Sequence, residues 1–197
     1  AEMGAAVRSY LGVSIDEQTS WKTTDFALKR WRETLERVGI YVFKEAFKQD
    51  EHCGFCLYHE EFPLIYVNNS RPKTRQIFTL AHELGHLLFH TSGIDAATDD
   101  VVGIAKPDAN RIEVICNRFA RAFLIPFEHF SIQLQNARIN RDGASDLADL
   151  YCVSREVIYR EFLDRGLVSS DEYSAAVAAW RKGAAKAGGD GGTYYNT

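Results

Sequence analysis

The spacing of hydrophobic and polar residues predicts one helix, a group of short strands and then further helices. Hydrophobic residues recur at helical intervals over residues 22–38, and Gly39 follows as a stop signal. Three short strand-like runs come next, separated by charged or glycine-containing turns: residues 40–43, 55–58 and 64–68. The economical interpretation is a small antiparallel sheet, so we expect an α+β fold.

Two stronger helices follow the strands. The first covers about residues 74–89, and the second runs from residue 111 to 125, where Pro126 ends it. The connection between them, residues 91–109, is rich in Gly and Asp. We expect it to be a mobile flap, since loops of this length are usually functional or disordered.

The remainder of the chain is helical to about residue 180 and is followed by a glycine-rich stretch. Both ends look as if they are cut from something longer. The expected organisation has four parts: an N-terminal segment 1–21, a main domain 22–135, a helical region 136–182 and a flexible tail 183–197.

Composition limits the class of protein. The 197 residues are 46% hydrophobic and 25% charged, as in ordinary globular proteins, and the net charge of -4 argues against a surface dominated by nucleic-acid binding. Without a membrane-length apolar run or a signal peptide, we expect a cytoplasmic protein. The four cysteines do not form a disulfide framework, and the CxxC at 53–56 is interpreted as ordinary thiols.

The first of the two strong helices carries a metal-binding pattern. His82 and His86 lie one helical turn apart, so both imidazoles project from one face and can share an ion. Glu83, rotated by about 100°, is placed to act as a base on a water at that ion. An apolar arc of this helix contains Ile77, Leu80, Leu84, Leu87 and Leu88. A separate polar arc contains Thr79, His82, Glu83, His86 and His90.

A catalytic zinc usually takes three protein ligands. His90 is about 12 Å along a straight helix from His82, so one ion cannot bridge both. Glu113 flanks the buried arc of the second helix and is the better third ligand, because a carboxylate there is costly to bury unless it binds a cation. The alternative is that Glu113 only stabilises the start of its helix through the helix dipole. Asn117, one turn on, could orient Glu113 or a histidine ligand. Weaker rivals for the third position are Asp95, Asp99, Asp100 and His129.

Together these segments resemble the ImmA/IrrE metallo-endopeptidases. The similarity covers roughly residues 22–170 and is carried by Tyr66-Val67-Asn68-Asn69, the FTLAHELGH sequence over 78–86, Glu113, Asn117-Arg118-Phe119-Ala120 and Leu124-Ile125-Pro126. The resemblance implies a zincin-type helix pair with Glu113 as third zinc ligand. It also implies an intracellular protease that cuts helix–turn–helix repressors of the XRE type. The XRE-type domain that many members carry at the N-terminus is absent here.

Residues 147–158 also have a helix–turn–helix cadence, with Ser154 as the cap of the second helix. The alternative function is therefore a DNA-binding or partner-binding regulatory protein with a structural metal site. Acidic residues among the basic ones weaken the binding of DNA phosphates by this region. Glu83 argues against a purely structural metal site, because such a site needs no base beside its ligands.

Two aspects of catalysis stay open at this level. His90, Tyr66 and Arg75 are candidate donors to a developing oxyanion. For the substrate, we expect strand 64–68 to lie at the sheet edge and to bind an extended peptide. Ile65 and Val67 would then face the core and Tyr66 the cleft, unless this strand is interior and paired on both sides.

Overall fold

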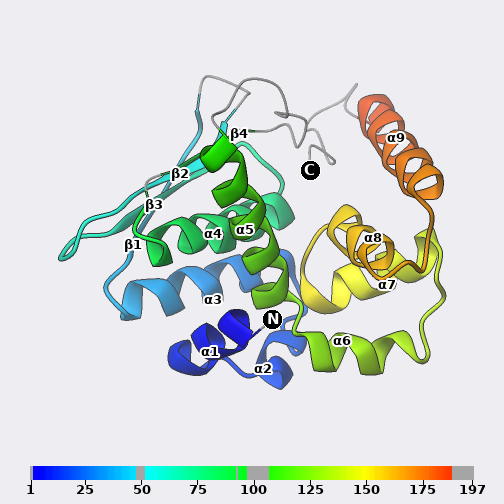
Figure 1. Cartoon of the computed structure of the whole chain (residues 1–197), viewed down its shortest axis with the longest axis horizontal. Coiled ribbons are helices and arrows are strands. Elements are labelled where there is room, and N and C mark those ends of the chain that lie inside the picture. The colour runs from blue at the N-terminus through cyan, green and yellow to red at the C-terminus, as the bar shows by residue number, and fades with distance from the viewer. Residues whose placement is uncertain (1, 48–51, 92, 97–106, 188–197) are drawn as a thin grey trace.

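The computed structural model describes residues 2–47, 52–91, 93–96 and 107–187, and in these residues helices surround a four-stranded sheet (Figure 1). This arrangement confirms the predicted α+β class. No helix within the described ranges is both long and apolar enough to cross a membrane.

The first part of the chain forms three helices: α1 (Glu2–Leu11), α2 (Ile15–Thr19) and α3 (Thr24–Arg37). The hydroxyl of Thr23 caps α3 by accepting a hydrogen bond from the Phe26 amide, so the helix predicted over 22–38 begins at this cap. The buried Arg8 of α1 donates to the Phe123 carbonyl 3.0 Å away, which ties the N-terminal segment to a helix much later in the chain.

The sheet contains β1 (Tyr41–Glu45), β2 (His52–Leu57), β3 (Leu64–Asn68) and β4 (Gly93–Ala96), in the order β1-β3-β2-β4. The β2 strand pairs antiparallel with both β3 and β4, but β1 and β3 are parallel. The expected purely antiparallel sheet is therefore wrong. The hydrophobic alternation of each run determines which side chains face the core, but it does not determine which strands become neighbours.

The prediction that strand 64–68 lies at an edge is also wrong. The β3 strand pairs with β1 on one side and β2 on the other, and β1 and β4 are the outer strands of the described sheet. Ile65 and Val67 are fully buried on the core face, as alternation predicted. Tyr66 lies on the opposite face, where its ring stacks on Phe55 at 5.1 Å and its hydroxyl donates to Glu45 at 2.6 Å.

The central helix α4 (Lys73–Leu88) packs against the sheet, against α3 and against α5 (Pro107–Leu124). Most of α4 is buried, including four members of its polar arc, Thr79, His82, Glu83 and His86, whereas His90 follows the end of the helix and is exposed. Leu88 of the apolar arc is instead 42% exposed, at the last position of the helix. A Cβ on Gly85 would lie 3.1 Å from the Phe119 ring, so this glycine permits the close approach of α5.

The C-terminal part contains α6 (Phe127–Leu134), α7 (Arg141–Tyr151), α8 (Arg155–Asp164) and α9 (Ser170–Ala187). Cys152 adopts a left-handed conformation between α7 and α8, and Ser154 caps α8, which matches the predicted turn. Figure 1 shows these helices beside the sheet-containing part rather than over the sheet. Of the expected flap, 93–96 forms β4, and residues 97–106 lie outside the described ranges.

Gly54 of β2 marks the closest contact between the sheet and α4. A Cβ at this position would lie 2.5 Å from the Thr79 methyl and 2.6 Å from the Tyr66 carbonyl oxygen, and the backbone oxygen cannot move aside cheaply. We expect Gly54→Ala to lower the free energy of unfolding by about 1–3 kcal/mol, measured by urea denaturation of the metal-free protein. Gly183→Ala is the control, because open space surrounds Gly183 in α9 and the change should stabilise by about 0.5–1 kcal/mol. Equal stability of the Gly54 variant and the wild type would contradict the packing constraint.

Candidate metal centre

Three side chains from two helices converge at the contact between α4 and α5. His82 Nε2 lies 3.1 Å from one Glu113 oxygen, and His86 Nε2 lies 3.1 Å from the other. The two Nε2 atoms are themselves 3.1 Å apart. Within the described part of the chain, these residues form the one group of three or more potential ligands whose donor atoms lie within 4.8 Å of one another.

The spacing of the donors fits a tetrahedral metal. Zinc binds imidazole nitrogens and carboxylate oxygens at about 2.0–2.2 Å, which places the donors of a tetrahedral site roughly 3.3 Å apart. The observed separations of 3.1 Å are close to this value. Three protein donors leave a fourth position for water or substrate, as in catalytic rather than closed structural sites.

The other ring nitrogens of both histidines have partners that orient the rings. His82 Nδ1 lies 2.9 Å from the Asn117 amide oxygen, and His86 Nδ1 lies 3.0 Å from the Thr91 hydroxyl. Thr91 donates its own proton to the His86 carbonyl, so this hydroxyl accepts from His86 Nδ1. Both Nδ1 atoms therefore carry the proton, and both Nε2 lone pairs point toward Glu113.

Glu113 is ready to act as an anionic ligand. Burial raises the pKa of its carboxyl, but when His82 and His86 carry a second proton at Nε2, their hydrogen bonds and charges outweigh burial and lower the pKa to about 2. The side chain remains 42% exposed, in contrast to the two histidines at 2%. The cluster is therefore enclosed on the α4 side and accessible from the α5 side.

Glu83 follows His82 directly on α4 and is fully buried. Burial first, and then the charges of Glu113 and Glu83, raise the pKa of the neighbouring Cys116 thiol to about 12. This effect indicates that both carboxylates lie close to the same point of α5. An ionisable side chain held without solvent exposure beside a metal-ligand cluster is placed for proton transfer.

Comparison with known protein families agrees with this geometry. Residues 35–162, well over half of the 197 residues, match the Peptidase_M78 family, the IrrE N-terminal-like domain. This chain is a member of the ImmA/IrrE peptidase family. The matched range contains all of the sheet, α4, α5, α7 and most of α8, so the match extends into the helix–turn–helix-like helices. No curated protein matches the chain significantly.

Several residues proposed from the sequence lie elsewhere in this ImmA/IrrE peptidase. The exposed ring of His90 stacks on Tyr58 at 4.6 Å. Arg75, at the opposite end of α4 and about 10 Å along the helix from His82, donates to the Cys53 sulfur at 3.2 Å. Tyr66 faces away from α4 on the outer side of the sheet.

Of the rival third ligands, the structure describes the side chain of His129 alone, and it is not part of the cluster. His129 belongs to α6 and contacts α7, where its Nδ1 is 2.7 Å from the Tyr151 hydroxyl. The side chains of Asp95, Asp99 and Asp100 lie outside the described set. The four cysteines are buried, and none of them forms a disulfide bond.

Thr91 is the functional residue that sequence reasoning missed. It follows the end of α4, where His90 adopts a left-handed conformation with φ of 54° and turns the chain back toward His86. The sequence shows a hydroxyl five positions after His86, which could have suggested a contact. Whether this hydroxyl reaches His86 depends on the turn at His90, and the helical pattern does not predict that turn.

The contacts of Asn117 and Thr91 predict their effect on metal affinity. Removing the group that orients a metal-binding histidine typically weakens binding about 10- to 100-fold. We expect Asn117→Ala and Thr91→Val each to weaken zinc binding by that factor, measured by competition with a chromogenic chelator. His90→Asn, which keeps a residue tolerant of the left-handed conformation, should bind zinc like the wild type. Normal affinity in both folded variants would show that the two contacts do not orient the ligands.

Proposed function

We propose that this ImmA/IrrE peptidase is a zinc-dependent endopeptidase that cleaves a helix–turn–helix repressor of the XRE type in the cytoplasm and so relieves repression. The observation that carries the proposal is the convergence of His82, His86 and Glu113 beside a fully buried Glu83. A structural metal site would use its donors to close the coordination shell and would gain nothing from this carboxylate.

In this proposal, His82, His86 and Glu113 hold the zinc ion, and Asn117 and Thr91 keep both imidazoles oriented. When bound, the zinc ion polarises the scissile carbonyl and makes the attacking water more acidic. Glu83 takes the proton of that water and passes it to the leaving amine. The burial of Glu83 excludes bulk water that would otherwise compete for this proton.

The substrate has to be held in an extended conformation to expose its peptide bond. Because β3 is interior, we propose that β4 provides the edge for strand addition. The β4 strand begins two residues after Thr91, which contacts His86, and among the described strands it pairs with β2 alone. Its outer edge is therefore the closest unpaired strand edge, along the chain, to the metal ligands.

The alternative function as a DNA-binding protein has less support. The Arg155 guanidinium lies 5.1 Å from the centre of the Trp180 ring, and Arg160 donates to Asp164 at 2.9 Å. Both basic residues of α8 therefore contact α8 or α9 of the same chain. These contacts favour a packing role for the helix–turn–helix-like pair.

Glu83→Gln provides the direct test of the mechanism. The variant should retain about one zinc ion per chain but lose cleavage by at least about a hundredfold, because the general base is removed while the ligands are kept. The measurement is fragment formation on incubation with an XRE-type repressor from the same genome, together with metal analysis.

Glu113→Ala is the matched control, since it should lose both metal and cleavage. Wild-type cleavage by the zinc-loaded Glu83→Gln protein would exclude Glu83 as the base. Intact repressor after incubation with the zinc-loaded wild type would count against the proposed substrate.

A further inference from the structure

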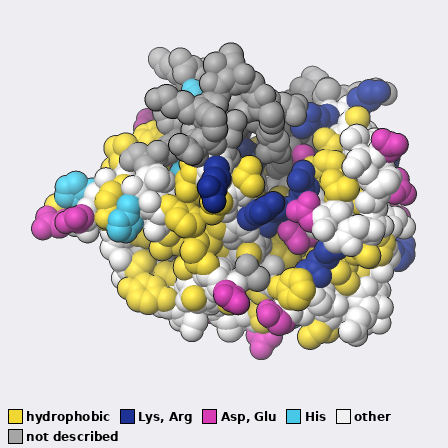
Figure 2. Space-filling view, viewed as in Figure 1, with side chains coloured by type: hydrophobic (Ala, Val, Ile, Leu, Met, Phe, Trp, Pro, Cys, Tyr) yellow, Lys and Arg dark blue, Asp and Glu magenta, His cyan; other side chains and the backbone are white. Residues whose placement is uncertain are grey.

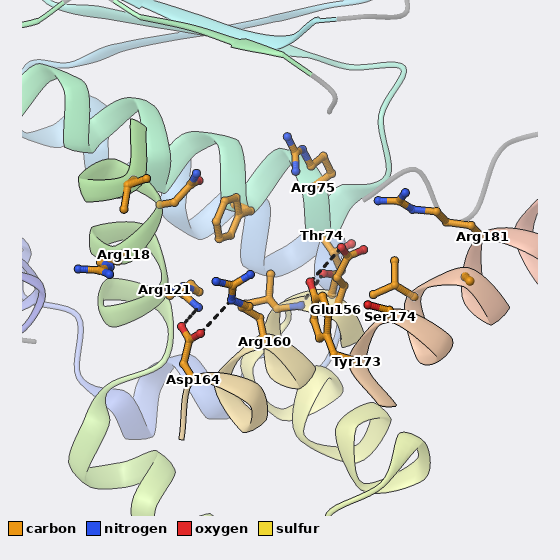
Figure 3. A pocket seen from close by; sticks show the side chains of 17 residues that line it. Thr74, Arg75, Arg118, Arg121, Glu156, Arg160, Asp164, Tyr173, Ser174 and Arg181 are labelled. Atoms are coloured by element: carbon orange, nitrogen blue, oxygen red, sulfur yellow. Dashed lines mark hydrogen bonds and ion pairs between the residues drawn. The ribbon is translucent and has the colours of Figure 1, made fainter. Parts of the chain in front are cut away.

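A large cavity lies between α5 and the C-terminal helices. Its volume is about 940 Å³, within the range of peptide- and ligand-sized sites, and its walls come from α4, α5, α8 and α9 (Figure 3). Five of the lining residues are arginines: Arg75, Arg118, Arg121, Arg160 and Arg181.

The two acidic residues in the lining do not neutralise these arginines fully. Asp164 is shared, because Arg121 donates to it at 2.6 Å and Arg160 at 2.9 Å. Glu156 accepts a hydrogen bond from the Tyr173 hydroxyl at 3.4 Å. Glu161, outside the lining, also lies 3.6 Å from Arg121, so five arginines face three carboxylates. The cavity therefore has a local excess of positive charge in a chain whose formal net charge is -4.

Arg118 and Arg181 are the arginines best placed to bind an external anion. Both are exposed, and neither forms an ion pair with an acidic group that the structure describes. They come from α5 and α9 on different walls of the cavity. Figure 2 shows basic side chains gathered in the middle of this face, with hydrophobic side chains beside them.

The cavity begins next to the candidate metal centre. Its lining includes Asn117, whose amide oxygen contacts His82. It also includes Val114, which is 49% exposed and directly follows Glu113 in the sequence. With a rise of 1.5 Å per residue, Arg118 lies about 7 Å and Arg121 about 12 Å along α5 from Glu113. An extended peptide covers this range with about two to four residues at roughly 3.3 Å each.

We propose that this cavity is a specificity subsite that binds the carboxylate of an Asp or Glu located about two to four residues from the cleaved peptide bond. Arginine forks match carboxylate geometry, and the apolar side chains of Phe78 and Val177 accommodate the aliphatic part of an acidic residue. A nucleic acid would instead require cations along an extended strip. The position relative to the cleaved bond rests on the proposed function, whereas the binding of an acidic peptide does not.

Binding is tested on the full-length, metal-free chain with two fluorescein-labelled probes, hexaglutamate and hexaglutamine. By fluorescence anisotropy, hexaglutamate should bind at least about tenfold more tightly, and the double variant Arg118→Glu/Arg181→Glu should lose about tenfold of that affinity. Lys182→Glu is the control, because Lys182 adjoins Arg181 on α9 but does not line the cavity, and it should stay within about twofold of the wild type.

Three results would overturn the subsite. One is an equal loss in the control and the double variant, which would indicate unspecific charge attraction. The second is an unchanged affinity of the double variant for hexaglutamate. The third is tighter binding of a single-stranded oligonucleotide of equal charge that the same arginine variants abolish, which would identify a nucleic-acid site.

Cleavage separates this inference from the proposed function. In a set of peptides in which one glutamate moves along an otherwise fixed cleavable sequence, kcat/KM should peak about two to four residues from the cleaved bond, and the double variant should lose the peak. Glu83-dependent cleavage without such a peak would overturn the subsite and leave the peptidase intact. Arginine-dependent binding of hexaglutamate without cleavage of any peptide or repressor would overturn the peptidase and leave an acidic-peptide site.

Discussion

The rest of the structure depends on the contact between α4 and α5, because this contact brings a carboxylate from one helix to two imidazoles of the other. Two histidines one turn apart form half of a site wherever a helix exists, but Glu113 is 27 positions beyond His86. Its placement depends on how closely the second helix can approach. Gly85 between Glu83 and His86 permits that approach, and Cys116 and Phe119 pack against it.

The elements around α4 bury its polar residues and provide partners for its histidines. The sheet covers one side of α4 and α3 covers another, so polar residues such as His82 and Glu83 are buried as completely as Leu80 and Leu84. Burying so many polar groups is costly unless each finds a partner. Asn117 and Thr91 meet that demand for the histidines and at the same time determine which ring nitrogen remains available.

Much of this arrangement was predictable from the sequence, and the limits have identifiable causes. The His82 and His86 spacing and the position of Asn117 one turn after Glu113 are local consequences of helix geometry, which periodicity captures. The parallel pairing of β1 with β3 and the interior position of β3 depend on which strands become neighbours, and no short pattern determines this. The contact of Thr91 and the stacking of His90 both depend on the left-handed conformation of His90 after the end of α4. Histidine tolerates this conformation, but its presence in a sequence does not predict it.

The hydrogen bonds at the far end of α5 affect the order of folding. The Gln18 amide donates to the Leu124 carbonyl at 2.9 Å and to the Tyr151 carbonyl at 3.1 Å, across 106 and 133 positions of sequence. Arg8 reaches the Phe123 carbonyl across 115 positions. Contacts this distant in sequence form late, because the intervening chain must first be ordered. The N-terminal helices therefore complete their packing on the end of α5 only after residues up to Leu124, and with them both helices that carry the metal ligands, have been synthesised.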